Sequence, residues 1–342
     1  MRIAIITRPD NKSPKNLAIT LAKSLDTNNI QSEIFYDTGF LTRMVALSDN
    51  LRWNVKSHYR IRQKLKFYFK DLKTLRKLKT FQAVIICECI PNAMWRNVYP
   101  IESLRSNIKL PIGLYEVFFL ESAPHFIDKL KTEYHNFTNP YDFELAISSS
   151  SYTKIINKKN QFKVGFNLMA QGIKPINKDE FIALIDFEWE GEKKYILEQK
   201  KVLDELGIKY LELKGNYTID EIREVYSKCS VFFLQHFESF GLPIAESLSY
   251  GAQIFTANSG WPMAFRLNDD IEIYGKGSLA DCFTVYKDEA DLRKKLLKFK
   301  KEYTNETPFN VFNSFIKNYP DFYEGNNKEL EKMTTFIENF NS

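Results

Sequence analysis

Long apolar segments and cysteines are both scarce in this sequence, and each shortage excludes a class of protein. No run of about 18 apolar residues occurs, so no transmembrane helix is predicted. The N-terminal segment reaches Arg8 and Pro9 too early for a secretory signal, so we expect a cytoplasmic protein. Four scattered cysteines, at positions 87, 89, 229 and 282, are too few for a disulfide framework. We expect reduced core cysteines rather than a zinc site, because Cys-x-Cys lacks the spacing of a zinc ligand pair. No cofactor is expected.

Glycine and proline are also infrequent, with 13 and 12 among 342 residues, and 44% of the residues are hydrophobic. This composition is typical of a soluble globular protein and excludes a disordered or fibrous chain. A chain of this length exceeds the size at which one hydrophobic core keeps growing, so two domains are expected.

Short apolar runs alternate with helical patterns in both halves of the chain. Strands are predicted at residues 2–7, 32–36, 83–87, 110–115, 143–148, 163–167, 181–185, 209–213 and 231–234. Helical spacing follows the first strand and recurs at residues 195–206, and Thr218 with Glu221 forms a capping-box pattern. Such alternation predicts an α/β fold with parallel sheets. We place one domain at residues 1–170, a second at 171–305, and a helical segment at 306–342 that packs back on the first.

The densest group of candidate site residues follows the strand predicted at residues 231–234. The sequence from Glu238 to Glu246 combines a polar turn with a short helix whose first residue is predicted to be Pro243. The first backbone N–H groups of such a helix have no partner within it, and the helix dipole adds partial positive charge there. A diphosphate is the expected ligand, and Gly241 permits its close approach to the backbone.

Two acidic residues flank this turn at a separation of eight positions. Glu246 lies about one turn into the predicted helix, where its carboxylate would accept hydrogen bonds from ribose hydroxyls. Glu238 precedes the helix and would meet sugar hydroxyls. His236 is a further candidate for donor contact, with a structural histidine as the alternative. The arrangement predicts a nucleotide-sugar site.

The stretch from Phe233 to Ala257 resembles the E-x7-E region of retaining glycosyltransferases of family 4. Residues 141–150 and 171–174 are similar to the end of that family's first domain and to its interdomain turn. The resemblance implies a GT-B fold, in which two Rossmann-like domains carry parallel sheets that face a central cleft. It also implies a nucleotide-sugar donor bound by the second domain, an acceptor on the first, retention of configuration and no required metal.

The resemblance assigns roles by position. Glu238 would face the donor sugar as a catalytic residue, Glu246 would hold the ribose, and backbone amides from 239 to 242 would contact sugar and phosphates. The complete donor-binding set is His236, Ser239, Phe240, Gly241, Leu242, Pro243, Glu246 and Lys193.

The chain departs from the family pattern at two places. The family usually has glycines in the first loop of its first domain, where this chain has Arg8 and Pro9. It also places an Arg and a Lys after the first strand of its second domain, whereas residues 186–194 are acidic until Lys193 and Lys194. Either lysine would neutralise a leaving diphosphate, and we assign the catalytic role to Lys194. A solvated start of a helix is the alternative.

The acceptor side is less defined. If the reaction inverts configuration, a carboxylate or histidine of the first domain must take the acceptor proton. Glu116 follows a predicted strand and is the catalytic candidate there, while Arg8 and His125 are weaker acceptor-side candidates. An exposed loop acid and a structural histidine are the alternatives.

Positive charge is concentrated at residues 52–79, where eleven basic residues accompany one acid, although the net charge is only +5. From Leu65 onward the apolar positions 65, 68, 69, 72 and 75 recur at helical spacing with lysines on other faces, which predicts a basic amphipathic helix. Three interpretations stay open: contact with an anionic membrane surface, a solvated face packed on its own domain, and nucleic-acid binding.

The sequence therefore predicts a glycosyltransferase that moves a sugar from a nucleotide-sugar donor to a glycan or lipid-linked acceptor. Surface polysaccharide synthesis at the inner face of the membrane is the expected setting. Two alternatives remain. The basic stretch favours an enzyme that adds sugar to modified bases in DNA. The two departures favour a non-catalytic nucleotide- or sugar-binding protein on a degenerate GT-B fold.

Overall fold

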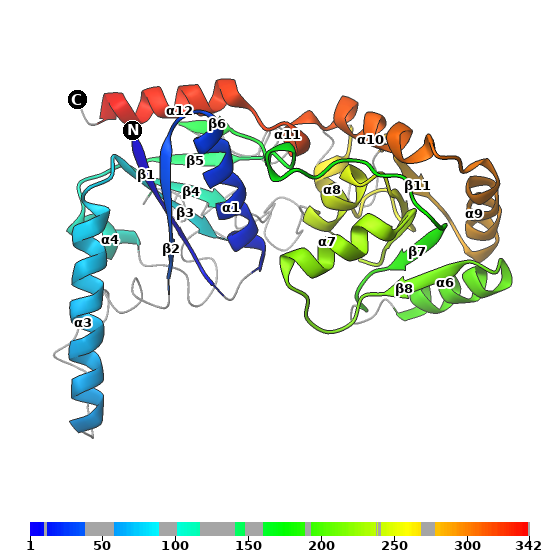
Figure 1. Cartoon of the computed structure of the whole chain (residues 1–342), viewed down its shortest axis with the longest axis horizontal. Coiled ribbons are helices and arrows are strands. Elements are labelled where there is room, and N and C mark those ends of the chain that lie inside the picture. Colours follow the sequence, from blue (N-terminus) through cyan, green and yellow to red (C-terminus); the bar gives the residue numbers. More distant parts are fainter. Residues whose placement is uncertain are drawn as a thin grey trace. The chain divides into compact units, whose positions relative to one another are not determined.

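The computed structural model describes residues 1–9, 12–37, 58–88, 101–116, 141–147, 160–188, 193–236, 238, 241–267 and 278–340. These residues form two compact units, which are coloured along the chain in Figure 1. The first unit contains the described residues up to Val164 and again from Asn326, and the second contains those of Gly165–Gly325. Both ends of the chain therefore belong to the first unit.

The first unit contains a six-stranded parallel sheet in the order β2-β1-β3-β4-β5-β6. Its strands are β1 (Arg2–Thr7), β2 (Gln31–Tyr36), β3 (Ala83–Glu88), β4 (Ile112–Glu116), β5 (Phe143–Ala146) and β6 (Gln161–Lys163). Every residue of β3 is buried, as are residues 3–7 of β1, because helices cover both faces of a parallel sheet. The predicted strands at 2–7 and 83–87 are confirmed.

The predicted strand at residues 163–167 is wrong. Strand β6 ends at Lys163, and the chain then turns at Gly165 and Asn167, whose φ angles are +75° and +56°. A left-handed backbone angle at these two positions interrupts the extended chain. The short apolar run had suggested a strand because backbone angles are not visible in hydrophobic patterning.

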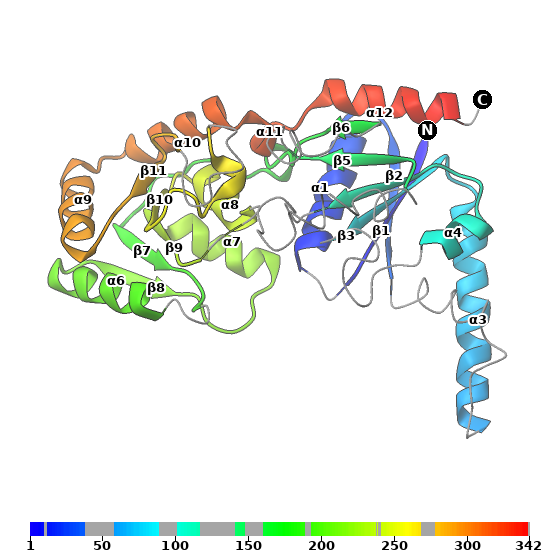
Figure 2. The same cartoon turned by 180° about the vertical axis from the view of Figure 1, so that it is seen from behind.

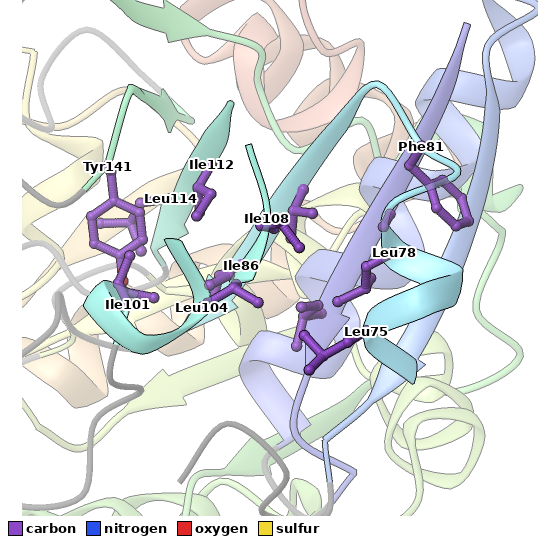
Figure 3. Packing of buried hydrophobic residues seen from close by; sticks show 13 residues of the cluster. Leu75, Leu78, Phe81, Ile86, Ile101, Leu104, Ile108, Ile112, Leu114 and Tyr141 are labelled. Carbon is purple, nitrogen blue, oxygen red and sulfur yellow. The ribbon is translucent and has the colours of Figure 1, made fainter. Parts of the chain in front are cut away.

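Four described helices belong to the first unit: α1 (Lys12–Thr27), α3 (His58–Leu78), α4 (Ile101–Asn107) and α12 (Asn327–Phe340). The C-terminal end of α3 contributes Leu75 and Leu78 to a core cluster with strands β1, β3 and β4 (Figure 3). Helix α12 places Phe336 at 5.7 Å from Phe143 and 5.8 Å from Phe162, measured between ring centroids. Helix α12 therefore packs on β5 and β6, although both strands are far from it in the sequence.

The second unit contains a five-stranded parallel sheet in the order β11-β10-β9-β7-β8. Its strands are β7 (Ile182–Ile185), β8 (Lys209–Glu212), β9 (Val231–Leu234), β10 (Gln253–Thr256) and β11 (Phe283–Val285). The α-helices are α6 (Lys193–Glu205), α7 (Ile219–Lys228), α8 (Leu242–Ser249), α9 (Glu289–Glu302), α10 (Thr307–Asn318) and α11 (Pro320–Tyr323). Parallel strands present their carboxyl ends at one edge, so the residues after β7 and β9 meet there.

Two local predictions hold in the second unit. Thr218 accepts a hydrogen bond from the Glu221 backbone N–H, and the Glu221 carboxylate accepts one from the Thr218 N–H, which completes the capping box at the start of α7. Cys229 and Cys282 are buried here, as is Cys87 in the first unit. Cys89 lies outside the described residues. No helix in the described part of the chain is long and apolar enough to cross a membrane.

Candidate functional site

The backbone on either side of Glu238 is tied to the loop that follows β10. The Glu238 N–H donates to the Trp261 carbonyl at 3.1 Å, and the Met263 N–H donates to the Glu238 carbonyl at 3.3 Å. Glu238 and Pro262 consequently form an isolated parallel bridge. This pairing fixes the position from which the Glu238 side chain extends, although the residue belongs to a loop.

Helix α8 begins one residue earlier than the sequence predicted, at Leu242 rather than Pro243. Gly241 is its N-cap residue with φ of +72°, and no described side chain caps the helix. Pro243 lacks an N–H, whereas the N–H groups of Leu242 and Ile244 belong to the first turn. This uncapped start offers backbone donors and the positive end of the helix dipole to an anion. Ser239 and Phe240 lie outside the described residues.

We expect Gly241→Ala to destabilise the protein and weaken nucleotide binding. A Cβ at this position would lie 2.8 Å from Phe265 Cε2 and 3.0 Å from Ile244 Cδ1. The left-handed backbone costs a non-glycine residue about 1–2 kcal/mol, and crowding adds about 1–3 kcal/mol. Gly215→Ala is the matched control, because its φ is +77° and nothing lies within 4 Å of the added carbon. Urea denaturation should show the larger loss at Gly241, and equal losses would contradict the crowding argument.

Asp186, His236 and Glu238 form a line of three ionisable side chains at the carboxyl ends of β7 and β9. His236 Nδ1 lies 3.6 Å from Asp186 Oδ2, and His236 Nε2 lies 3.3 Å from Glu238 Oε2. The imidazole thus bridges a buried carboxylate and the candidate catalytic carboxylate. Within the described residues, no group of three or more His, Cys, Asp or Glu side chains is arranged to hold a metal ion.

Burial dominates the protonation of Asp186. Its removal from water raises the pKa of Asp186 to about 7, against the lowering effects of His236 and of the Phe187 backbone N–H. The charge of Glu238 raises the pKa of Asp186 further. A pKa of about 7 leaves this carboxyl group partly protonated near neutral pH, beside the His236 ring.

Glu246 is buried on α8 and is held by a residue that sequence analysis missed. Arg223 on α7 donates to Glu246 Oε1 from Nε at 2.9 Å and from Nη2 at 2.7 Å, and its Nη2 also donates to Gln171 Oε1 at 2.6 Å. A carboxylate has about four acceptor positions, so an arginine on Oε1 is compatible with ribose hydroxyls on the same group. The contact depends on how α7 packs on α8, which no local motif indicates.

Tyr226 lies near three carboxylates of the candidate site. Burial raises the pKa of Tyr226 well above its usual value, and the nearby charges of Glu246, Asp186 and Glu238 raise it further. All three carboxylates therefore lie near one phenol on α7. The fold of the second unit thus brings together three acidic residues that are up to sixty positions apart in the sequence.

No protein-family model and no curated protein matches the sequence. Several solved structures, in contrast, are similar to this chain. Anabaena HepE in complex with UDP and glucose is 12% identical with a TM-score of 0.50, covering 99% of this chain and 100% of that one. A glycosyltransferase from Rickettsia africae is also 12% identical at 0.50, covering 99% and 98%. S. aureus MnaA with UDP is 10% identical at 0.51, covering 99% and 96%. The chain has a GT-B fold. At such identities the likeness concerns the fold alone.

In this GT-B chain the two candidate lysines lie at the exposed start of α6. Lys194 Nζ lies 4.7 Å from the centre of the Tyr195 ring, and that ring meets Trp261 edge to face at 5.2 Å. The Trp261 carbonyl accepts the Glu238 N–H. Lys194 is thus joined by two ring contacts to the loop that positions Glu238, while Lys193 is exposed on the same turn.

The acceptor-side candidates belong to the first unit. Arg8 directly follows β1, and its Nε lies 3.7 Å from Oε2 of the buried Glu88 at the end of β3. Glu116 is the last residue of β4 and is in register with Glu88, but its side chain lies outside the described part. His125 also lies outside it. Glu88 was not identified from the sequence as a candidate site residue. The available signal was that Glu88 directly follows five apolar residues.

Proposed function

We propose that this chain is a glycosyltransferase that binds a nucleotide sugar in its second unit. The observation that carries the proposal is that no described side chain caps the start of α8, which lies between two acidic residues. Each of these acidic residues contacts a different set of side chains. Glu238 is accompanied by His236 and Asp186, and Glu246 is accompanied by Arg223. A diphosphate at the helix start would place a ribose toward Glu246 and a sugar toward Glu238.

The proposed chemistry follows from charge. Breaking the bond between the anomeric carbon and phosphate leaves a positively charged, oxocarbenium-like carbon and a negatively charged diphosphate. Donors fixed in place before the reaction stabilise such developing charge. The backbone N–H groups of α8 would serve the diphosphate, with Lys194 as a mobile counter-charge. Glu238 would orient the sugar and face the carbon as positive charge develops.

The family 4 resemblance supports the finer part of the proposal. On that basis transfer retains the anomeric configuration and requires no metal. The acceptor is a glycan or lipid-linked sugar used in surface polysaccharide synthesis at the inner face of the membrane. If configuration inverts, Glu116 becomes the candidate base, with Arg8 and His125 near the acceptor.

A thermal-shift panel of nucleotides and nucleotide sugars tests the donor site. UDP is the first ligand to try, because the HepE and MnaA structures contain it. A ligand that binds only the folded state at 100 times its Kd stabilises that state by about 2.7 kcal/mol, so we expect a clear rise in Tm. If no nucleotide or nucleotide sugar stabilises the protein, the proposal fails.

Glu238→Gln separates binding from catalysis in the same assay. We expect it to keep stabilisation by UDP and to slow hydrolysis of the sugar donor by about 100-fold or more, the usual cost of losing one stabilising group. Glu224→Gln is the control, because Glu224 is exposed on α7 and pairs with Lys228. A wild-type protein that binds UDP-sugars but never cleaves or transfers them would favour the non-catalytic alternative.

A further inference from the structure

Helix α3 has two halves with different surroundings. Its C-terminal end packs on the sheet of the first unit, where Leu75 and Leu78 are 8% and 0% exposed. Further toward the N-terminus, Leu65 is 51% exposed, Tyr68 40% and Phe69 66%. In both views the first turns of α3 extend past the sheet of their own unit (Figures 1 and 2). The apolar positions predicted to form one face are therefore divided between core and solvent.

The exposed apolar residues share one side of the helix. At about 100° per residue, positions 65, 68, 69 and 72 lie on one face, while 66, 70 and 73 lie on an adjacent face. Lys66, Lys70 and Lys73 are exposed, and none of them forms an ion pair with a residue that the structure describes. Lys77, in contrast, pairs with Glu33 near the sheet. The helix carries eight basic residues and one acid, which gives its own sequence a net charge of +7.

This combination favours one kind of partner. A solvated helix face does not require three large apolar side chains within five residues, and a phosphate backbone offers no apolar layer to receive them. An anionic bilayer surface offers both a headgroup layer for lysines and an acyl boundary for Leu and Phe. Tyrosine is suited to the interface between those layers, and lysine stems reach from the apolar layer to the headgroups.

We propose that α3 docks this protein on an anionic lipid bilayer, with Leu65, Tyr68 and Phe69 entering the interface and Lys66, Lys70 and Lys73 contacting lipid headgroups. The inference deepens the proposed function, because it would hold a glycosyltransferase beside a lipid-linked acceptor. The docking itself depends only on α3, so it can be tested without knowing the sugar donor.

Vesicle flotation of the full chain tests the proposal. We expect the protein to float with vesicles that contain phosphatidylglycerol, to float poorly with pure phosphatidylcholine, and to detach as salt rises. Lys66→Gln with Lys70→Gln should lower the partition coefficient about 25-fold, since each basic residue contributes about fivefold. Phe69→Ser should lower it about tenfold through lost apolar burial.

Helix α9 in the second unit provides the matched control. It also exposes a leucine, Leu297, beside two exposed lysines, Lys294 and Lys298. Leu297→Ser and Lys294→Gln with Lys298→Gln should leave flotation unchanged. Each α3 variant should keep the melting temperature and UDP response of the parent protein, which shows that lost flotation does not reflect unfolding.

Several outcomes would overturn the docking proposal. These are no flotation with anionic vesicles, an equal loss in the α3 and α9 variants, or salt-sensitive binding of duplex DNA without vesicle binding. A dimer that Phe69→Ser dissociates, again without vesicle binding, would assign the face to a second copy of the chain. Flotation without any nucleotide response would support the docking while removing the proposed transferase function, so the two failures are distinguishable.

Discussion

Replacing Glu246 with alanine is expected to lower the free energy of unfolding by about 3–5 kcal/mol and to remove nucleotide binding. The side chain of Arg223 is only 14% exposed, and Glu246 accepts two of its hydrogen bonds. Removing the carboxylate takes both of these hydrogen bonds from a guanidinium that is largely withdrawn from water. The same substitution removes the proposed ribose acceptor. Urea denaturation and calorimetric titration with UDP measure the two effects.

Arg223→Ala separates the two roles of Glu246. It should destabilise the protein comparably and weaken UDP binding less than Glu246→Ala, because the carboxylate remains but loses its orientation. A double-mutant cycle between the two positions should give a coupling energy above about 1 kcal/mol. Glu224→Ala, which breaks an exposed pair on the same helix, should change stability by less than about 1 kcal/mol. Unchanged UDP binding in Glu246→Ala would contradict the ribose assignment.

Asp186→Asn is expected to stabilise the protein at pH 8 and to have little effect at pH 4. The native pKa of Asp186 is raised to about 7 from an ordinary value of 3.8, mainly by burial. The folded protein therefore holds this proton more tightly than the unfolded chain, and stability from this group is lost as pH rises from about 4 to about 7. The difference above pH 7 is up to about 4 kcal/mol, and the asparagine variant avoids it.

Chemical denaturation of both proteins at pH 4, 6 and 8 measures this difference. Asp204→Asn on the exposed side of α6 is the control and should not change the pH dependence. Asp186→Asn should also reduce turnover more than UDP affinity, because His236 loses its carboxylate partner and no longer orients Glu238 in the same way. A stability gain that is the same at all three pH values would show that Asp186 does not titrate in this range.

The candidate donor loop shows how far sequence analysis reached. Its helix start, its glycine and its two acids lie within nine residues of the chain, so strand and helix patterning located them, with the helix start one residue late. Asp186 was passed over as part of an acidic segment, although a polar residue directly after a buried strand was a usable signal. Arg223 had no such signal. Its partner is 23 positions away, on a helix whose packing is decided by the whole unit.

Helix α3 also shows what sequence patterning could not predict. Periodicity predicted a basic amphipathic helix, but it placed Leu65 and Leu75 on one apolar face. The structure buries Leu75 in the core cluster of the first unit and leaves Leu65 51% exposed. Hydrophobic spacing indicates which residues share a face of the helix. It does not indicate how far along the helix the neighbouring surface extends.

The sequence by itself determined the features that depend on neighbours along the chain. These are the strands up to β9 apart from β6, the capping box at Thr218, the turn at Gly241 and the alternation that produces two parallel sheets. Strands β10 and β11 were not predicted. Tertiary structure alone decided that Arg223 supports Glu246 and that His236 joins Asp186 to Glu238. The physical reason is that strands and caps are stabilised by local backbone geometry and hydrogen bonding, whereas these contacts form only when distant elements pack together.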